Sequence, residues 1–254
     1  MTPALEIVSL SRRFGGLLAI DDVSFSIARG GLSALIGPNG AGKTTLFNAI
    51  TNIFPPTSGE VRFMGQSLAG IAGDKLARLG LVRTFQTARV FPGMTVLENA
   101  LAGACLRARS NAVAQMLRLP SARAEERKLR EQASALLDLI GLSAFRDAAA
   151  TDLPMGAQKN LEVVRALMAD PAMLLLDEPA AGLNDSETAD LAALLTAIRD
   201  CGVTIMVVEH NMSLVMGIAD QVVVLDAGRL VAAGAPADIQ RDARVIEAYV
   251  GGSV

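Results

Sequence analysis

The sequence has few of the residues that mark a disulfide-bonded or a nucleic-acid-binding protein. Its two cysteines, Cys105 and Cys201, lie far apart and form no CxxC pair, which favours a reducing compartment over a disulfide-bonded secreted fold. The 23 basic and 26 acidic residues leave a net charge of −3 and a pI near 5.3, so we expect no nucleic acid partner.

Long apolar runs are also missing. The mean hydropathy is +0.39, yet charged residues, Gly or Pro interrupt every apolar run before it reaches membrane-spanning length. The first residues show no basic stretch followed by an apolar one, so no secretion signal is expected. Hydrophobic residues make up 51% of the chain, which excludes a disordered or fibrous protein. We therefore expect a folded, soluble, cytoplasmic chain with an apolar surface for a partner.

Strand and helix patterns alternate in the two outer parts of the chain, and helical patterns replace them from about residue 88 to 161. Strands that alternate with helices predict a mainly parallel sheet covered on both faces, here with a helical insertion. The predicted strands are residues 5–10, 23–27, 32–36, 60–64, 81–85, 172–176, 203–208 and 221–225. The predicted helices are residues 43–52, 95–106, 123–140, 186–200 and 211–218.

A glycine-rich loop follows the third predicted strand and fits G-x-x-x-x-G-K-[ST] without a mismatch. Its glycines let backbone N–H groups curl around phosphate oxygens, and the following helix adds the positive end of its dipole. Lys43 is predicted to reach the β- and γ-phosphates, and the Thr44 hydroxyl to hold Mg²⁺. The alternative is a glycine-rich turn that binds nothing. The predicted nucleotide-binding residues here are Gly37, Pro38, Asn39, Gly40, Ala41, Gly42, Lys43, Thr44 and Thr45.

Two carboxylates end a later apolar strand, residues 173–178. Asp177 is predicted to hold the hydration shell of Mg²⁺ and Glu178 to polarise the attacking water. Adjacent strand residues point to opposite sides, which favours separate roles for the two acids. A solvated acidic turn before Pro179 explains the same residues equally well if they are taken without the phosphate loop.

Together these motifs resemble those of the ATP-binding-cassette (ABC) family, and the resemblance covers essentially the whole chain. Walker A corresponds to residues 37–44, Walker B to 173–178, the signature loop to 153–159 and the D-loop to 181–184. Gln86 occupies the place of the Q-loop glutamine, and His210, the only histidine, that of the switch histidine. The resemblance implies that Gln86 contacts Mg²⁺ or water and that His210 stabilises phosphate charge.

The resemblance also implies the fold and two further contacts with ATP. The fold is an α/β P-loop NTPase with a RecA-like core, an antiparallel β lobe and an inserted α-helical subdomain. Residues 1–87 and 162–254 would form the core lobe and residues 88–161 the helical subdomain. Phe14 takes the place of the aromatic residue that stacks on adenine, although an edge-strand core residue is the alternative. Met155 and Gly156 of the signature would contact the ATP bound on a partner cassette.

Several stretches are similar to the first ATPase subunit of bacterial branched-chain amino acid importers, among them residues 13–19, 83–86, 94–99, 179–184 and 209–217. This resemblance implies ATP and Mg²⁺ as ligands and a second cassette, identical or different, as a partner. It also implies two membrane permease subunits and, indirectly, a periplasmic solute-binding protein. The chain would lie peripherally on the cytoplasmic face of the inner membrane. Four apolar residues are candidates for the permease contact, with ordinary core packing as an equal alternative for each: Phe85, Val90, Phe91 and Met94.

One departure concerns the signature loop, where Pro154 replaces the usual Ser or Ala and Ala157 the usual Gln. Proline supplies neither a hydroxyl nor an N–H to the γ-phosphate on the partner cassette. We therefore expect the ATP site that this loop completes to be the less active one. The alternatives are a soluble ABC ATPase for DNA repair or translation, a catalytically weak cassette, and a small P-loop kinase.

Overall fold

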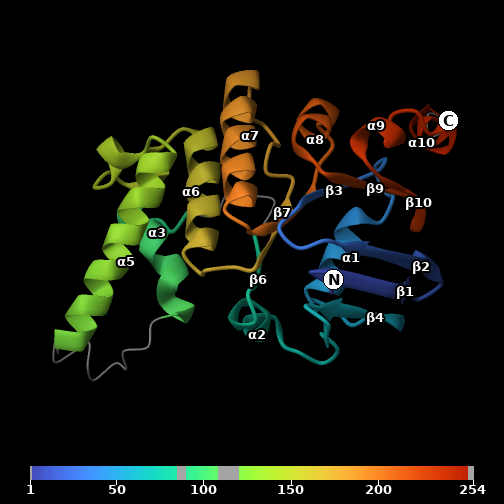
Figure 1. Cartoon of the computed structure of the whole chain (residues 1–254), viewed down its shortest axis with the longest axis horizontal. Helices are drawn as coiled ribbons and strands as arrows, with labels where there is room; N and C mark the ends of the chain where they lie inside the picture. The colour runs from blue at the N-terminus through green and yellow to red at the C-terminus, as the bar shows by residue number, and fades with distance from the viewer. Residues whose placement is uncertain (1, 85–89, 108–119, 251–254) are drawn as a thin grey trace.

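The computed structural model describes residues 2–84, 90–107 and 120–250, and its N-terminal strands form a four-stranded antiparallel sheet (Figure 1). The strand order is β2-β1-β4-β5. β1 carries buried residues at Leu5, Ile7 and Leu10, which give this sheet one apolar face. The strands are β1 (Leu5–Phe14), β2 (Leu17–Ile27), β4 (Ser58–Phe63) and β5 (Gln66–Ser67).

A second sheet of six strands, in the order β10-β9-β3-β8-β7-β6, holds the centre of the molecule. Five of its strands are parallel, and β10 joins the edge antiparallel to β9. β3, β7 and β8 are buried at every position, as expected for parallel strands covered on both faces. The strands are β3 (Leu32–Ile36), β6 (Leu81–Arg83), β7 (Met173–Asp177), β8 (Thr204–Val208), β9 (Gln221–Asp226) and β10 (Arg229–Gly234).

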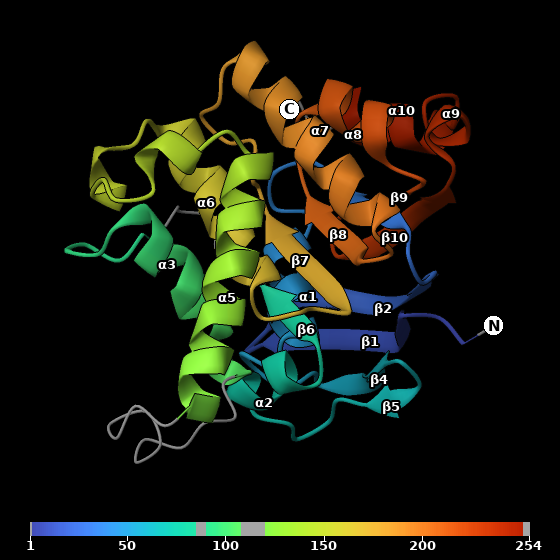
Figure 2. The same ribbon diagram turned by 60° about the vertical axis from the view of Figure 1, so that its left-hand side comes forward.

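The two faces of this sheet pack differently. One face packs with α1 (Lys43–Ile50) and the antiparallel sheet around Phe47, Leu35 and Leu175. The other packs with α6 (Met155–Leu167), α7 and α8, and in Figure 2 α7 and α8 lie above the sheet while β1, β4 and β5 lie below it. The remaining helices of the core lobe are α2 (Gly73–Arg78), α7 (Asp185–Asp200), α8 (Met212–Ile218), α9 (Pro236–Ile239) and α10 (Ala243–Val250).

The helical subdomain lies on the left in Figure 1 and has its own apolar core. It contains α3 (Val96–Ala102), the 3₁₀ turns Gly103–Leu106, Ser143–Phe145 and Ala150–Asp152, α5 (Pro120–Leu139) and α6 (Met155–Leu167). α6 contributes Leu161 and Val164 to this core, but Val163 and Ala166 to the core of the six-stranded sheet. The proposed boundary at residue 161 therefore falls inside a helix that both lobes share.

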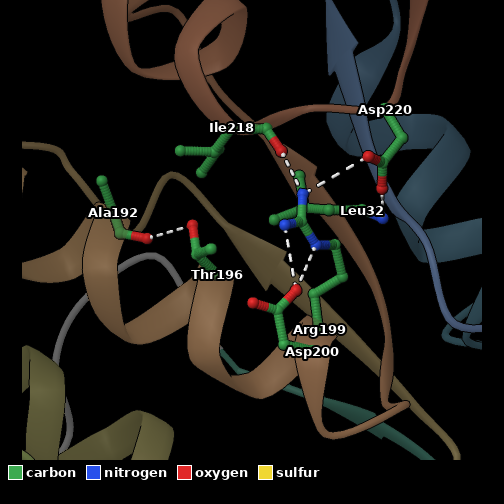
Figure 3. A network of polar contacts seen from close by, with 7 residues as sticks. All are labelled: Leu32, Ala192, Thr196, Arg199, Asp200, Ile218 and Asp220. Carbon is green, nitrogen blue, oxygen red and sulfur yellow. Dashed lines mark hydrogen bonds and ion pairs between the residues drawn. The ribbon is translucent and has the colours of Figure 1, made fainter.

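A polar network fixes the start of β3, the strand that leads into the phosphate loop (Figure 3). Arg199, near the end of α7, donates to the Ile218 carbonyl at 3.4 Å and to Asp220 Oδ1 at 3.3 Å. The other oxygen of Asp220 accepts the Leu32 N–H at 2.8 Å. The ends of two helices are thus joined to the first residue of β3. Within the described ranges, no helix combines the length and the apolar character needed to span a membrane.

The candidate nucleotide site

The loop between β3 and α1 has two glycines at which any side chain would be both strained and too close to a neighbouring strand. Gly37 has φ 152° and Gly42 has φ 97°, both in the region that side chains rarely adopt. A Cβ at Gly37 would overlap the Leu225 carbonyl oxygen, and one at Gly42 would lie 2.8 Å from the Ala19 carbonyl oxygen. The loop therefore folds tightly against β9 and β2, and it ends at the N-terminus of α1.

Lys43, the first residue of α1, folds back over this loop. Its ammonium group donates to the Gly37 carbonyl at 2.6 Å and to the Pro38 carbonyl at 2.9 Å. Burial lowers the pKa of Lys43 from its ordinary value, and the nearby carboxylate of Glu178 opposes that shift. A buried cation is thus held at the mouth of a loop whose N–H groups are suited to anions.

An open pocket of about 480 Å³ lies over the loop. It brings together several of the predicted nucleotide-binding residues with Glu178, which comes from the end of β7. Residues of β2 and of the β9–β10 turn form the other walls and were not predicted from the sequence. The lining is Leu17, Leu18, Ala19, Asn39, Gly40, Ala41, Gly42, Lys43, Thr44, Thr45, Glu178, Ala227 and Gly228.

The two carboxylates at the end of β7 have different surroundings, as the alternation along a strand predicts. Asp177 is buried, and its Oδ2 pairs with Arg83 Nη2 at 2.7 Å. Arg83 also donates to Asn48 Oδ1 at 2.8 Å and to Thr51 Oγ1 at 2.9 Å, both on the α1 side. Glu178 instead lines the pocket and has φ 48°, a strained backbone conformation for a residue with a side chain.

The residues near the loop fit Mg²⁺ held together with a nucleotide. The exposed Thr44 hydroxyl at the start of α1 and the Asp177 carboxylate at the end of β7 are oxygen ligands of the kind that Mg²⁺ takes. Over the described ranges, no three His, Cys, Asp or Glu side chains gather into a group that could hold a metal by themselves. Mg²⁺ commonly takes one or two protein ligands and completes its shell with phosphate oxygens and water.

His210 and Phe14 lie outside the lining of this pocket. His210 follows β8 with an exposed side chain, and its N–H donates to Glu209 Oε2 at 3.1 Å. Phe14 is the last residue of β1. Its ring packs edge-on against the Phe54 ring, with 5.2 Å between the ring centroids, and the Arg12 guanidinium carbon lies 4.5 Å from the centroid of the Phe14 ring. Phe14 therefore already has an aromatic and a cationic neighbour, and its contact with adenine stays a prediction.

The signature residues begin α6, with Pro154 at its N-cap. Met155 is 58% exposed, whereas Gly156 is buried. A Cβ at Gly156 would lie 2.6 Å from Glu187 Oε1, so the glycine allows α6 to pack closely on the start of α7. Gln86 and Phe85 lie outside the described residues, and their roles stay predictions.

Comparison with known proteins decides the family. The sequence matches the family described as ABC transporter over residues 20–181, more than half of the chain. It is 43% identical over 250 residues to the high-affinity branched-chain amino acid transport ATP-binding protein BraF of Pseudomonas aeruginosa, and 98% of each chain is covered. The chain belongs to the ABC transporter family. Its fold is that of an ATP-binding cassette, as the sequence motifs predict.

Further matches agree with this assignment of the cassette. The chain is 41% identical over 250 residues to the high-affinity branched-chain amino acid transport ATP-binding protein LivG of Escherichia coli, with 98% of each chain covered. Residues 229–254 match the family described as branched-chain amino acid ATP-binding cassette transporter. A crystal structure of the ADP conformation of an ABC transporter cassette is 31% identical, has a TM-score of 0.85 and is matched over 99% of this chain and 100% of that one.

Three charged residues of the cassette were not predicted as functional from the sequence. Arg83, Lys159 and Glu209 are each largely buried and contact the ends of β7 or β8. The only signal in the sequence is that each of the three stands within or beside one of the motifs. Their partners are brought to them by the fold.

Removing one partner of the Arg83–Asp177 pair should destabilise the cassette strongly. Both side chains are about nine-tenths buried, so Arg83→Met leaves a buried carboxylate without its cation, at a cost of about 3–5 kcal/mol. Arg62→Met is the matched control, because its pairs with Glu6 and Glu60 lie at the surface and should contribute little to stability. Urea unfolding measures both; equal losses for the two variants would contradict the argument.

Proposed function

We propose that this cassette is the ATP-hydrolysing subunit of an importer for branched-chain or other hydrophobic amino acids, or for related small solutes. The named relatives carry branched-chain amino acid transport in their descriptions, and the C-terminal segment matches a family described by the same substrates. The observation that carries the hydrolysis is the pocket itself, where the phosphate loop, Lys43 and Glu178 meet.

In this proposal each residue of the pocket acts on a different part of the reaction. The loop N–H groups and Lys43 bind the phosphates, and Glu178 orients the attacking water. Asp177 and Thr44 hold Mg²⁺, which neutralises phosphate charge when it is bound. Gln86 contacts the metal or the water, and His210, at the end of the neighbouring strand, stabilises the charge on the γ-phosphate. These contributions are mainly positioning and electrostatic, as phosphoryl transfer requires.

A second cassette completes the site in this proposal. Two cassettes close head to tail, so that Met155 and Gly156 of one chain face the ATP bound to the loop of the other. The exposed Met155 side chain and the N-terminus of α6, where Pro154 gives no side-chain cap, are suited to such a contact. Closure with ATP and opening after hydrolysis then convert the reaction into a two-state motion.

Two permease subunits are the proposed membrane partners, with a periplasmic solute-binding protein acting through them. A pocket of about 380 Å³ lies between β6, α2 and the helical subdomain, and Phe91 and Arg165 line it. Phe91 and Met94 are exposed, which supports their proposed contact with the permease, whereas Val90 packs against the subdomain core. The cassette would accordingly lie on the cytoplasmic face of the inner membrane.

Pro154 is proposed to weaken the site that this signature completes. It stands at the N-cap of α6 and gives that helix no side-chain acceptor or donor. A serine would supply one hydroxyl to the γ-phosphate of the partner's ATP, and a hydrogen bond to a charged group contributes about 1.5 kcal/mol. Pro154→Ser should therefore raise the ATPase rate of the assembled transporter by up to roughly tenfold.

Pro236→Ser is the control for that variant, because Pro236 stands at the first position of α9, far along the chain from the signature. The steady rate of phosphate release by the assembled transporter is the measurement. If Pro154→Ser is no faster than wild type or Pro236→Ser, the proposed weakness of the signature is wrong.

Purification from native membranes tests the assignment as an importer. A tagged Glu178→Gln chain is purified in detergent with Mg²⁺ and ATP, and the proteins that accompany it are identified by mass spectrometry. We expect two integral-membrane subunits and a cassette partner. Recovery of soluble partners only would favour the alternative, an ABC ATPase without a transport role.

A further inference from the structure

Two of the four lysines of the chain are buried, and each donates to main-chain carbonyls of a motif loop. Lys43 is part of the phosphate loop. Lys159 lies on α6, three residues after Gly156 of the signature, and is 7% exposed. Its ammonium group donates to the Pro179 carbonyl at 3.0 Å and to the Ala181 carbonyl, and lies 3.5 Å from the Glu178 carbonyl oxygen. A cation on the signature helix thus binds the turn that carries Glu178.

Glu209 holds the same turn from the other side. Its side chain is fully buried, in the loop between β8 and α8. Oε1 accepts the Ala180 N–H at 2.7 Å, and Oε2 accepts the N–H groups of His210 at 3.1 Å and Asn211 at 3.4 Å. One carboxylate therefore joins the turn after β7 to the loop that carries His210.

The two charges act on one short stretch of backbone. Lys159 binds carbonyls on both sides of Ala180, and Glu209 binds the N–H of Ala180 itself. Burial lowers the pKa of Lys159, and the Glu209 carboxylate is the largest of the influences that oppose this shift. The stretch begins at Glu178, whose φ of 48° needs support from its surroundings, and the Glu178 N–H is held by the Val208 carbonyl at 2.9 Å.

α6 is also fixed to the D-loop by a second contact. Gly156 packs on the carboxylate of Glu187, and that carboxylate accepts the Asn184 N–H at 3.0 Å in a capping box. Asn184 ends the D-loop and caps α7. The first turns of α6 therefore contact the segment after β7 at both of its ends, at Glu178–Ala181 and at Asn184–Glu187.

We propose that Lys159 and Glu209 are positioning residues that hold the Glu178 carboxylate and the His210 loop in place for hydrolysis. Through Lys159, the signature helix, which serves the partner's ATP, is joined to the turn that serves the chain's own ATP. The proposal rests on the function proposed above and adds a role for two residues that do not line the pocket over the phosphate loop.

Replacing Lys159 in the assembled transporter tests this role. Lys159→Met removes the donor, and a shift of the Glu178 turn by about 1 Å is expected to lower kcat by up to about 100-fold. The KM for ATP should stay within about twofold, because Lys159 lies outside the phosphate loop. Lys159→Arg, which can donate to the same carbonyls, should recover most of kcat. Lys128→Met, at an exposed site on α5, is the matched control.

Glu209→Gln extends the test to the second charge. The amide cannot accept all three N–H groups, so kcat should fall as for Lys159→Met. If the two residues support one turn, the double variant should be no slower than the slower single variant. Should Lys159→Met fail to fold, Lys159→Gln takes its place, with a kcat expected between those of wild type and Glu209→Gln.

Several outcomes would overturn the proposal. One is a kcat for Lys159→Met equal to that of Lys128→Met. A second is a loss of kcat in Lys159→Met that Lys159→Arg does not recover. A third is a loss of kcat that comes with an equal loss of ATP affinity. Either of these would indicate general damage to the fold. An inactive wild-type complex would instead contradict the proposed ATPase function, so the two failures can be told apart.

Discussion

Replacing Glu178 with glutamine should lower ATP hydrolysis by about 10²–10⁴-fold, the contribution of a positioned general base. The amide keeps the size of the side chain but cannot accept the proton of the attacking water. Binding of ATP should remain, because the phosphate loop and Lys43 are unchanged. The measurements are phosphate release by the assembled transporter and ATP affinity of the same variant.

Glu126→Gln is the control for this replacement. Glu126 lies on α5, and its exposed side chain forms an ion pair with Arg130, four residues later on the same helix. Replacing it should leave the rate of ATP hydrolysis unchanged. A Glu178→Gln transporter that turns over ATP at close to the wild-type rate would remove Glu178 from its assigned role. The Asp177 carboxylate, which already pairs with Arg83, would then need to be considered for that role.

Lys43→Met should abolish most of the ATP affinity. It removes the one ammonium group in the pocket, and losing one partner of a buried, hydrogen-bonded charge pair costs about 2–5 kcal/mol. That range corresponds to an increase of at least about 30-fold in Kd. Titration of the chain with a fluorescent ATP analogue measures it, and Lys128→Met should bind as wild type does. Similar affinities for the two variants would contradict the role of Lys43.

The pH dependence of binding should follow the same group. Burial lowers the pKa of Lys43, so in the free chain it loses its proton at a lower pH than an ordinary lysine. ATP binds the charged form of Lys43 more tightly than the neutral form. As the pH is raised, the Kd for ATP should therefore begin to increase at a lower pH than the one at which exposed lysines lose their proton. The sign for folding is opposite: stability should increase as pH rises through the lowered pKa, because a buried charge is removed.

The parts of the fold that depend on local patterns could be predicted from the sequence. The strands β3, β7 and β8 are buried on both faces and therefore appear in the sequence as apolar runs, each of which ends at a motif. α7 begins one residue before its predicted start, where Asn184 and Glu187 form a capping box. The Gly37–Lys43 loop depends on glycines at positions that only glycine fits, so its motif was sufficient to locate it.

The elements that depend on contacts distant in the sequence could not be predicted. β10 and the helices α9 and α10 were not among the predicted elements, because β10 is only partly buried and gains its place by pairing with β9. α3 was predicted to run to residue 106 but ends at Ala102. A 3₁₀ turn starts at Gly103, where the chain passes so close to the Arg165 carbonyl that a Cβ would overlap it.

The candidate site, too, has residues that motifs predict and residues that only the fold brings into place. The loop residues, Glu178 and Asp177 were predicted from motifs, but the partners that set their geometry come from other strands and helices. Arg83 reaches Asp177 because β6 pairs with β7, and Lys159 reaches the Glu178 turn because α6 packs on the same side of the sheet as α7. The β9–β10 turn that closes the pocket follows the last predicted strand.

Transport by the purified complex tests the central claim most directly. The complex that accompanies the tagged wild-type chain is reconstituted into liposomes with the solute-binding protein of the same system, and uptake of labelled leucine, isoleucine and valine is measured with and without ATP. We expect ATP-dependent accumulation with the wild-type chain and none with Glu178→Gln. Equal uptake by the two complexes, or ATP-dependent uptake of a chemically different solute only, would contradict the account.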